Sequence, residues 1–276
     1  MNADLHCHST ASDGALSPGD VVRRAATQGV EMLALTDHDQ LDGLHEAREA
    51  AHETGIVLVD GVEISVSWRG VTLHVVGLGV DARNPALNAG LERVRSGRIA
   101  RARAMGQSLE QAGISGSFEG ALALARNPAM VSRTHFARHL AQCGCVAGTK
   151  DAFRHYLVPG KPGYVPHDWA PLAEALRWIV DAGGRAVLAH PGRYALSAGA
   201  MESLLAEFRA AGGKAIEVVT GSHSRDQYAL FGALAVQHGL AASRGSDFHG
   251  PEESAELGSL PALDRCLRPV WADWEV

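Results

Sequence analysis

Short apolar runs that end in histidines and carboxylates recur along the chain, and they restrict how it can fold. The first run ends in Asp4-Leu5-His6-Cys7-His8. Five others share this form: Thr36-Asp37-His38-Asp39, Gly61-Val62-Glu63, Ala189-His190-Pro191, Gly221-Ser222-His223 and Ser246-Asp247-Phe248-His249. In an alternating α/β fold the carboxyl ends of the strands meet at one edge, where binding sites form. The six clusters are therefore expected to surround one site that binds several metal ions.

Strand and helix patterns alternate between these clusters. Strands are expected at residues 2–8, 31–36, 56–67, 71–80, 185–189, 214–219 and 240–244, and helices at 17–29, 42–54, 172–182, 201–211 and 225–239. Ser17 followed by Pro18 is a typical helix start. Repeated strand and helix units imply an α/β fold with a parallel sheet, either open or closed into a barrel.

The middle of the chain has a different pattern. A long helix is expected from Asn84-Pro85 to Gly113, followed by shorter helices and a turn-rich stretch at 159–163. We therefore expect a barrel in two parts, residues 1–80 and 185–276, with a mainly helical insertion at 81–184.

Composition excludes several classes of protein. The 276 residues are 46% hydrophobic, which suits a full core, but no apolar run approaches the length of a membrane span and no signal peptide is expected. A formal net charge of -6 argues against stable binding of duplex nucleic acid. The four cysteines are too scattered for a disulfide framework. A cytoplasmic location is therefore expected, and the oligomeric state stays open.

The pair His6 and His8 is the strongest single indication of a metal site. Side chains two apart on a strand point to the same face, so both imidazoles can reach one ion. A lone strand histidine is usually a packed core residue, but five further clusters at strand ends favour a metal site. Histidine and carboxylate ligands without thiolates suit Mn²⁺, Fe²⁺ or Zn²⁺.

Together these motifs resemble the PHP (polymerase and histidinol phosphatase) family of the amidohydrolase-like group. The resemblance extends over nearly the whole chain, and it rests on the motifs around His6, Asp13, His38, Glu63, His74, His135, His190 and Asp247. It implies a distorted seven-stranded β/α barrel that holds two or three divalent metal ions, with Mn²⁺ as the expected ion.

The resemblance also implies a set of ligands. The first metal would be held by His6, His8, Glu63 and Asp247. Glu63 would bridge to a second metal held by His74 and His135, with His190 near that metal or the substrate. The third would be held by Asp13, His38 and His249.

Asp13 indicates a branch within the family. Histidinol-phosphate phosphatases of this family tend to have histidine at this position, whereas Ser12-Asp13-Gly14 is more similar to the branch acting on nucleotide 3',5'-bisphosphates and short 5'-phosphorylated RNA. The resemblance thus implies removal of the 3'-phosphate from a nucleotide bisphosphate, with trimming of short oligonucleotides from the 5' end. A histidinol-phosphate phosphatase, a C–N amidohydrolase and a non-enzymatic metal-binding module remain alternatives.

Phosphoester hydrolysis suits such a site, since two metal ions can share a hydroxide for in-line attack and clamp the phosphoryl oxygens. Glu63 is the residue expected to bridge the two metal ions. His190 or His223 is expected to protonate the leaving oxygen, a role that requires contact with that oxygen.

Substrate contacts are expected from basic residues near the ligands. Arg133 and Thr134 lie at a predicted helix start, where a guanidinium and free backbone amides suit a phosphate, and Arg193 follows His190 closely. Lys161 and Tyr164 on the turn-rich stretch are candidates for a second phosphate or a stacked base. The run that includes Arg98, Arg101 and Arg103 is expected to form a solvated helix face, with guidance of oligonucleotide ends into the site as the alternative.

Overall fold

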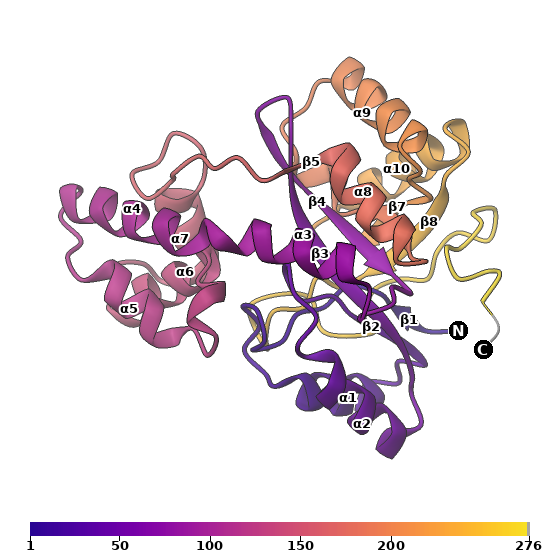
Figure 1. The fold of residues 1–276 in the computed structure, drawn as a ribbon, viewed down its shortest axis with the longest axis horizontal. Coiled ribbons are helices and arrows are strands. Elements are labelled where there is room, and N and C mark those ends of the chain that lie inside the picture. Colours follow the sequence, from indigo (N-terminus) through magenta and orange to yellow (C-terminus); the bar gives the residue numbers. More distant parts are fainter. Residues whose placement is uncertain (275–276) are drawn as a thin grey trace.

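The computed structural model describes residues 1–274, in which a curved sheet is surrounded by helices (Figure 1). The strands are β1 Ala3–Asp4, β2 Met32–Leu35, β3 Val57–Trp68, β4 Val71–Leu78, β5 Ala170–Pro171, β6 Arg185–Leu188, β7 Ala215–Thr220 and β8 Ala241–Gly245. Seven of them follow the order β1-β2-β3-β4-β6-β7-β8, and β5 pairs with β3.

The sheet closes on itself between its first and last strands. The amide of Leu5 donates to the carbonyl of Arg244 at 2.9 Å, and the amide of Asp247 donates to the carbonyl of His6 at 2.9 Å. Cys7 and Phe248 form an isolated parallel bridge. The predicted distorted β/α barrel is therefore confirmed.

Ten α-helices are described, most of them close to the ranges expected from the sequence. They are α1 Pro18–Thr27, α2 Leu44–Thr54, α3 Pro85–Ser96, α4 Arg98–Gln111, α5 Ser117–Leu124, α6 Arg133–Gln142, α7 Thr149–Ala152, α8 Leu172–Asp181, α9 Ala198–Ala210 and α10 Arg225–Gln237. Short 3-10 turns occupy Pro128–Met130 and Pro191–Arg193, and a π-helical turn occupies Phe153–Leu157. The Ser17 side chain caps α1 by accepting from the amide of Asp20, as the sequence predicted.

The sheet is mixed rather than wholly parallel. β4 runs antiparallel to both β3 and β6, because β3 and β4 form a hairpin around Arg69 and Gly70, which both have positive φ. The reversal brings the first half of β4 to the edge where the other strands end. His74 consequently lies beside Ser65 in the register of the hairpin.

Alternating side chains separate the inside of the barrel from its outside. In β2, Met32 and Ala34 pack in a cluster with residues of β1, β4, β6 and β7, which is the barrel interior. Leu33 and Leu35 pack instead against α1 and α2. This period of two is the pattern of a strand that is buried on both faces. Every residue of β2 is accordingly buried.

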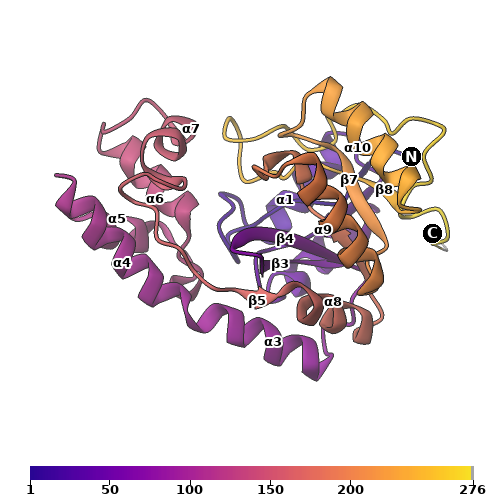
Figure 2. The ribbon, with the colours of Figure 1, turned by 90° about the horizontal axis from the view of Figure 1, so that it is seen from above.

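The helical insertion forms a lobe beside the barrel (Figure 2). Helices α4 to α7 share a separate hydrophobic cluster that includes Met105, Leu109, Phe136 and Leu140. In contrast, α3 and α8 pack in the same cluster as the outer face of the sheet. The lobe with its own core therefore spans fewer residues than the segment 81–184. The helices near the two ends of that segment, α3 and α8, cover the barrel instead.

The single helix predicted from Asn84 to Gly113 is divided at Gly97 into α3 and α4. A side chain at Gly97 would place its Cβ 2.5 Å from the ring of His167, so glycine permits this close approach. Within residues 1–274 no helix is both long and apolar enough to cross a membrane. The last two residues of the predicted segment 185–276 lie outside the described residues.

Candidate metal centre and substrate pocket

Residues from distant parts of the sequence meet at the carboxyl-end edge of the barrel. His6 and His8 follow β1, His38 follows β2, His190 follows β6, and Asp247 with His249 follows β8. Glu63 lies within β3, where its amide donates to the carbonyl of Thr36 at 3.1 Å. The predicted convergence of the strand ends therefore produces one buried cluster of imidazoles and carboxylates.

The first ligand group consists of His6, His8 and Asp247. The Nε2 atoms of His6 and His8 lie 3.5 and 3.3 Å from Oδ1 of Asp247. Glu63 approaches the same two rings, with Oε1 at 3.2 Å from His6 Nε2 and Oε2 at 3.4 Å from His8 Nε2. Two nitrogens and two carboxylates thus face a common point, and their binding of the first metal stays a prediction.

Glu63 also links this group to two others. One contains His6, Glu63 and His190, and the other contains His38, Glu63 and His74. Oε1 of Glu63 lies 2.8 Å from His74 Nδ1 and 3.0 Å from His190 Nε2, while Oε2 lies 2.8 Å from His38 Nδ1. Because its two oxygens face different sets of imidazoles, Glu63 has the geometry of a bridging ligand.

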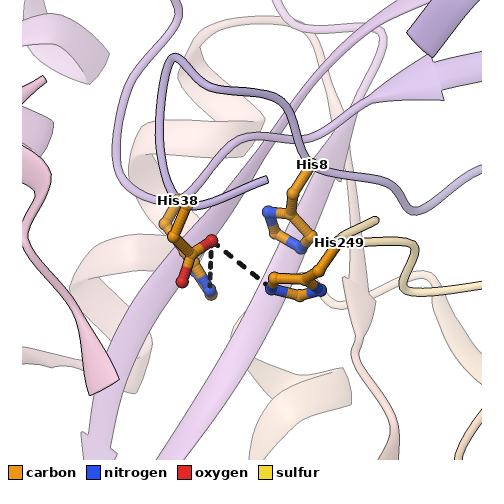
Figure 3. Close-up of side chains that lie close together, drawn as sticks. His8, His38 and His249 are labelled. Carbon is orange, nitrogen blue, oxygen red and sulfur yellow. Dashed lines mark ion pairs between the residues drawn. The ribbon is translucent and has the colours of Figure 1, made fainter. Parts of the chain in front are cut away.

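A further group consists of His8, Asp13, His38 and His249. Figure 3 shows the three imidazole rings gathered around one space, with dashed lines for two ion pairs. Oδ1 of Asp13 lies 3.3 Å from His249 Nε2 and 3.9 Å from His38 Nε2. Its other oxygen, Oδ2, accepts a hydrogen bond from Ser132 Oγ at 2.7 Å, so the lobe helps to orient this carboxylate.

The surroundings set the protonation of these side chains. Burial and the neighbouring His249 and His38 lower the pKa of His8 to about 3. Burial lowers the pKa of His74 to about 4, despite the nearby Glu63 carboxylate. Burial alone would raise the pKa of Glu63, but the imidazoles around it hold that pKa well below its usual value. His8 and His74 are therefore neutral near pH 7 and Glu63 is ionised, which are the forms that bind metal ions.

Several buried polar atoms in the cluster have no hydrogen-bond partner among residues 1–274. They are Nδ1 of His8, Oδ1 of Asp13, Nδ1 of His38, Oε2 of Glu63 and Nδ1 of His190. His38 Nδ1 and Glu63 Oε2 lie 2.8 Å apart without forming a hydrogen bond. Buried polar atoms are normally paired, so such orphans require an explanation. A cation bound beside the carboxylates of Asp13 and Glu63 and the ring of His38 provides one, and the nitrogen and oxygen donors suit a divalent ion.

The cluster forms one wall of a cavity of about 500 Å³. Four arginines, Arg98, Arg101, Arg133 and Arg193, line the same cavity. Burial, with the nearby charges of Arg133 and Arg98, lowers the pKa of Arg101 to about 9. Burial, with the charge of Arg193, lowers the pKa of Arg133 to about 10. The guanidiniums therefore repel one another, and a bound anion would relieve that repulsion.

A profile described as PHP domain matches residues 4–187. The chain belongs to the PHP domain family. A 3',5'-nucleoside bisphosphate phosphatase from Chromobacterium violaceum is 54% identical over 275 residues, which are 99% of this chain and 96% of that protein. A 5'-3' exoribonuclease from Haemophilus influenzae is 44% identical over 268 residues, 97% of each chain. A solved C. violaceum structure, described as an amidohydrolase with bound sulfate and no metal, is similar with a TM-score of 0.96 and 54% identity, covering 98% of this chain and 95% of that one.

Two residues predicted for this PHP site occupy different roles. Nδ1 of His135 accepts a hydrogen bond from the amide of Ser132 at 3.1 Å, and within residues 1–274 the ligand groups do not include His135. His223 is bonded to backbone through both ring nitrogens: Nδ1 donates to the carbonyl of Val218 at 3.0 Å, and Nε2 accepts from the amide of Gly192 at 2.9 Å. His135 thus caps α6, and His223 holds the turn after His190.

The predicted substrate contacts divide into two groups. Arg133, Thr134, Tyr164 and Arg193 line the cavity. Lys161 is exposed on the loop after Phe153–Leu157 and is not among the cavity-lining residues. Arg193 also donates through Nη1 to Asp247 Oδ2 at 2.7 Å, which joins the arginine group to the ligands.

Sequence reasoning missed a buried carboxylate behind the ligands of this PHP chain. Glu217 in β7 accepts from His6 Nδ1 at 2.7 Å through Oε1 and from the amide of His190 at 2.6 Å through Oε2. It fixes one ligand ring and the backbone that carries another. The sequence did contain one indication of this role, a single acid inside the otherwise apolar strand Ala-Ile-Glu-Val-Val. A buried charge requires partners, so such a residue is expected to bond to the groups around it.

Arg98 and Arg101 do not lie on a solvated helix face, which was the first of the two interpretations of this basic run. Arg98 is buried, pairs with the Asp39 carboxylate and donates through Nη2 to Ser65 Oγ at 3.2 Å. Arg101 donates through Nε to the carbonyl of Val165 at 3.0 Å. Arg103 is exposed as predicted.

Proposed function

We propose that this chain is a metal-dependent phosphatase that removes the 3'-phosphate of nucleoside 3',5'-bisphosphates and leaves the 5'-monophosphate. The observation that carries the proposal is one cavity lined both by metal-ligand groups and by four arginines. A substrate with two phosphates matches these two features, since one phosphate can be cleaved while the other is held. The C. violaceum and H. influenzae relatives support this reading through the activities in their names.

The metal ligands would be His6, His8, Glu63 and Asp247 for one ion, Glu63 with His74 for a second, and Asp13 with His38 and His249 for a third. Bound divalent ions would supply Lewis-acid charge for the phosphoryl group and for an attacking water. We propose Mn²⁺ as the native ion, because the donors are nitrogen and oxygen only and the family resemblance favours it.

The 5'-phosphate would be held by Arg133 and Arg193. Arg133 is the first residue of α6, so its guanidinium and the positive end of the helix dipole act together on an anion. Arg193 is kept near the ligands by its bond to Asp247. Arg101 would add charge to the same end of the cavity.

His190 is the proposed proton donor to the leaving 3'-oxygen. Its Nδ1 is buried without a partner, whereas both ring nitrogens of His223 are bonded to backbone. A general acid needs a nitrogen that can reach the leaving oxygen. His223 would instead position His190 through the turn that contains Gly192.

The aromatic residues of the cavity would receive the base. Phe153, Tyr164 and Trp169 line the cavity together with the arginines. Bases stack on aromatic rings without strong preference for sequence. The same contacts would accept the first nucleotide of a short 5'-phosphorylated oligonucleotide, so we include 5'-end trimming in the proposal.

The proposal can be tested with purified protein that has been depleted of metal and reconstituted with Mn²⁺. We expect phosphate release from adenosine 3',5'-bisphosphate with AMP as the nucleotide product. Histidinol phosphate and a simple amide serve as competing substrates. Turnover of either one without turnover of the bisphosphate would overturn the proposal.

A pair of variants separates substrate binding from metal binding. Arg133→Ala should raise KM for the bisphosphate by about 10- to 100-fold, as expected for loss of one charge-assisted contact of about 1.5–3 kcal/mol, while the metal content stays unchanged. Arg103→Ala on the exposed face of α4 is the matched control and should leave both quantities unchanged. Equal effects of the two substitutions would contradict the assigned phosphate site.

A further inference from the structure

Two exposed cysteines lie together at the end of the lobe helix that carries Ser132 and Arg133. Cys143 and Cys145 are both free and exposed, and their Sγ atoms lie 3.1 Å apart. Cys143 is the C-cap residue of α6, at the opposite end from the cavity. The pair is therefore accessible to reagents in solution, and it is separate from the proposed metal centre.

The helix ending holds the two thiols in this arrangement. The amide of Cys145 donates to the carbonyl of Leu140 at 2.9 Å, and the amide of Gly144 donates to the carbonyl of Ala141 at 3.1 Å. Gly144 has a φ of 76°. These are the two hydrogen bonds and the left-handed residue of a Schellman motif. Because the backbone is fixed, both side chains leave the turn on the same side.

We propose that Cys143 and Cys145 form a reversible redox site that exchanges with small-molecule disulfides. The thiolate of one cysteine attacks a disulfide RSSR, forming a mixed disulfide and releasing RS⁻. The second thiolate then attacks the protein sulfur of that mixed disulfide and releases a second RS⁻. In total, the two thiols lose two protons and two electrons, and RSSR is reduced to two RSH.

The geometry makes the intramolecular step fast and its product labile. Two sulfurs already in contact need to approach by only about 1 Å to reach a bond length near 2.05 Å. The hydrogen bond with Cys143 raises the pKa of the Cys145 thiol. A disulfide across one intervening residue closes a small ring, and exposed or strained disulfides are the easily reduced ones. The site would thus be oxidised only when the small-thiol pool becomes oxidising.

The test uses the full-length protein and a series of ratios of oxidised to reduced glutathione, followed by alkylation and intact-mass measurement. We expect the Cys143 and Cys145 pair of the wild type to lose two hydrogens without keeping an adduct, whereas the lone exposed thiol of Cys266 takes up glutathione or is alkylated. Cys143→Ser and Cys145→Ser should each retain glutathione as an adduct instead. Cys266→Ser is the matched control and should still lose two hydrogens.

Three results would overturn the proposal: stable glutathione adducts on both cysteines of the wild type, a covalent dimer through this pair, or thiol protection that disappears with a chelator, which indicates a bound soft cation. Serine is a conservative replacement at an exposed position, so the variants should keep the phosphatase activity of the wild type. The phosphatase assay therefore reports on the proposed function independently of the redox result.

Discussion

Replacing Glu217 with glutamine should weaken metal binding without changing any metal ligand. Glu217 accepts two hydrogen bonds, one from His6 Nδ1 and one from the amide of His190. In the neutral, metal-binding form of the ring, a proton on Nδ1 leaves His6 Nε2 free, and Nε2 is the atom that faces Glu63 and Asp247. The carboxylate thereby selects the ring tautomer that can bind a metal ion.

A glutamine side chain can accept only one of the two hydrogen bonds. The amide of His190 can only donate, so the glutamine oxygen must turn toward it. The glutamine NH₂ group then faces His6 Nδ1 and moves the ring proton to Nε2, where it blocks coordination. Loss of such an orienting partner typically weakens metal binding by about 10- to 100-fold, or about 1.4–2.7 kcal/mol.

The assay measures bisphosphate hydrolysis against free Mn²⁺ concentration, together with the metal content after dialysis. Glu217→Gln should need about 10- to 100-fold more Mn²⁺ for half-maximal activity, with KM for the substrate little changed. Glu202→Gln is a matched control, because Glu202 also accepts from a histidine, His238 Nε2 at 2.6 Å, but lies outside the cavity. A wild-type metal requirement in Glu217→Gln would refute the role assigned to the tautomer.

Three further changes test other parts of the structure. Gly90→Ala would place a Cβ 2.5 Å from an indole ring of α8, so the free energy of unfolding should fall by about 1–3 kcal/mol in urea denaturation, whereas Gly199→Ala meets nothing within 4 Å and should not destabilise. Arg98→Met removes the buried partner of the Asp39 carboxylate and should lower the free energy of unfolding by about 3–5 kcal/mol in urea denaturation. The pKa of His249, which burial alone would lower, is raised to about 9 by Asp13 and Asp247, so His249 is protonated at pH 7.5 in metal-free protein. Metal binding there should release a proton, and calorimetric heats that do not depend on the buffer would contradict this.

The clustering of most ligands could be predicted because strand ends are local features. His6 and His8 are two apart, so they share a face, and the helix after their strand returns the chain to the start of a parallel strand that ends at the same edge. The same reasoning applies to His38 and His190. The exact partners of each side chain were not predictable in this way. His8 and His38 each belong to two ligand groups, because each ring lies close to side chains from several strand ends.

His74 shows where local patterns stop being informative. Alternating strands and helices predict parallel neighbours, and a parallel fourth strand would carry its first half to the opposite end of the barrel. Only the tight hairpin at Arg69 and Gly70 reverses β4, and this brings His74 to Glu63. Its place was implied by family resemblance rather than by periodicity.

The arginines of α4 show a second limit. Arg98 and Arg101 are three residues apart and so lie on the same side of the helix, but the sequence does not specify what that side meets. The break at Gly97 and the separate core of the lobe turn this side toward the cavity. Contacts between distant segments decide whether a basic stripe is solvated or forms part of a binding site.

Some acidic residues of the sequence clusters are not in the ligand groups, and they make hydrogen bonds to the backbone instead. Asp4 accepts from the amides of Ser246 and Gly258, and Asp39 accepts from the amide of Ser65. Asp4 thus bonds to the loop after β8, and Asp39 joins the loop after β2 to β3. Each holds its loop by charge-assisted hydrogen bonds between protein groups. The ligand positions are therefore fixed before any ion binds, so metal binding needs little rearrangement of the backbone.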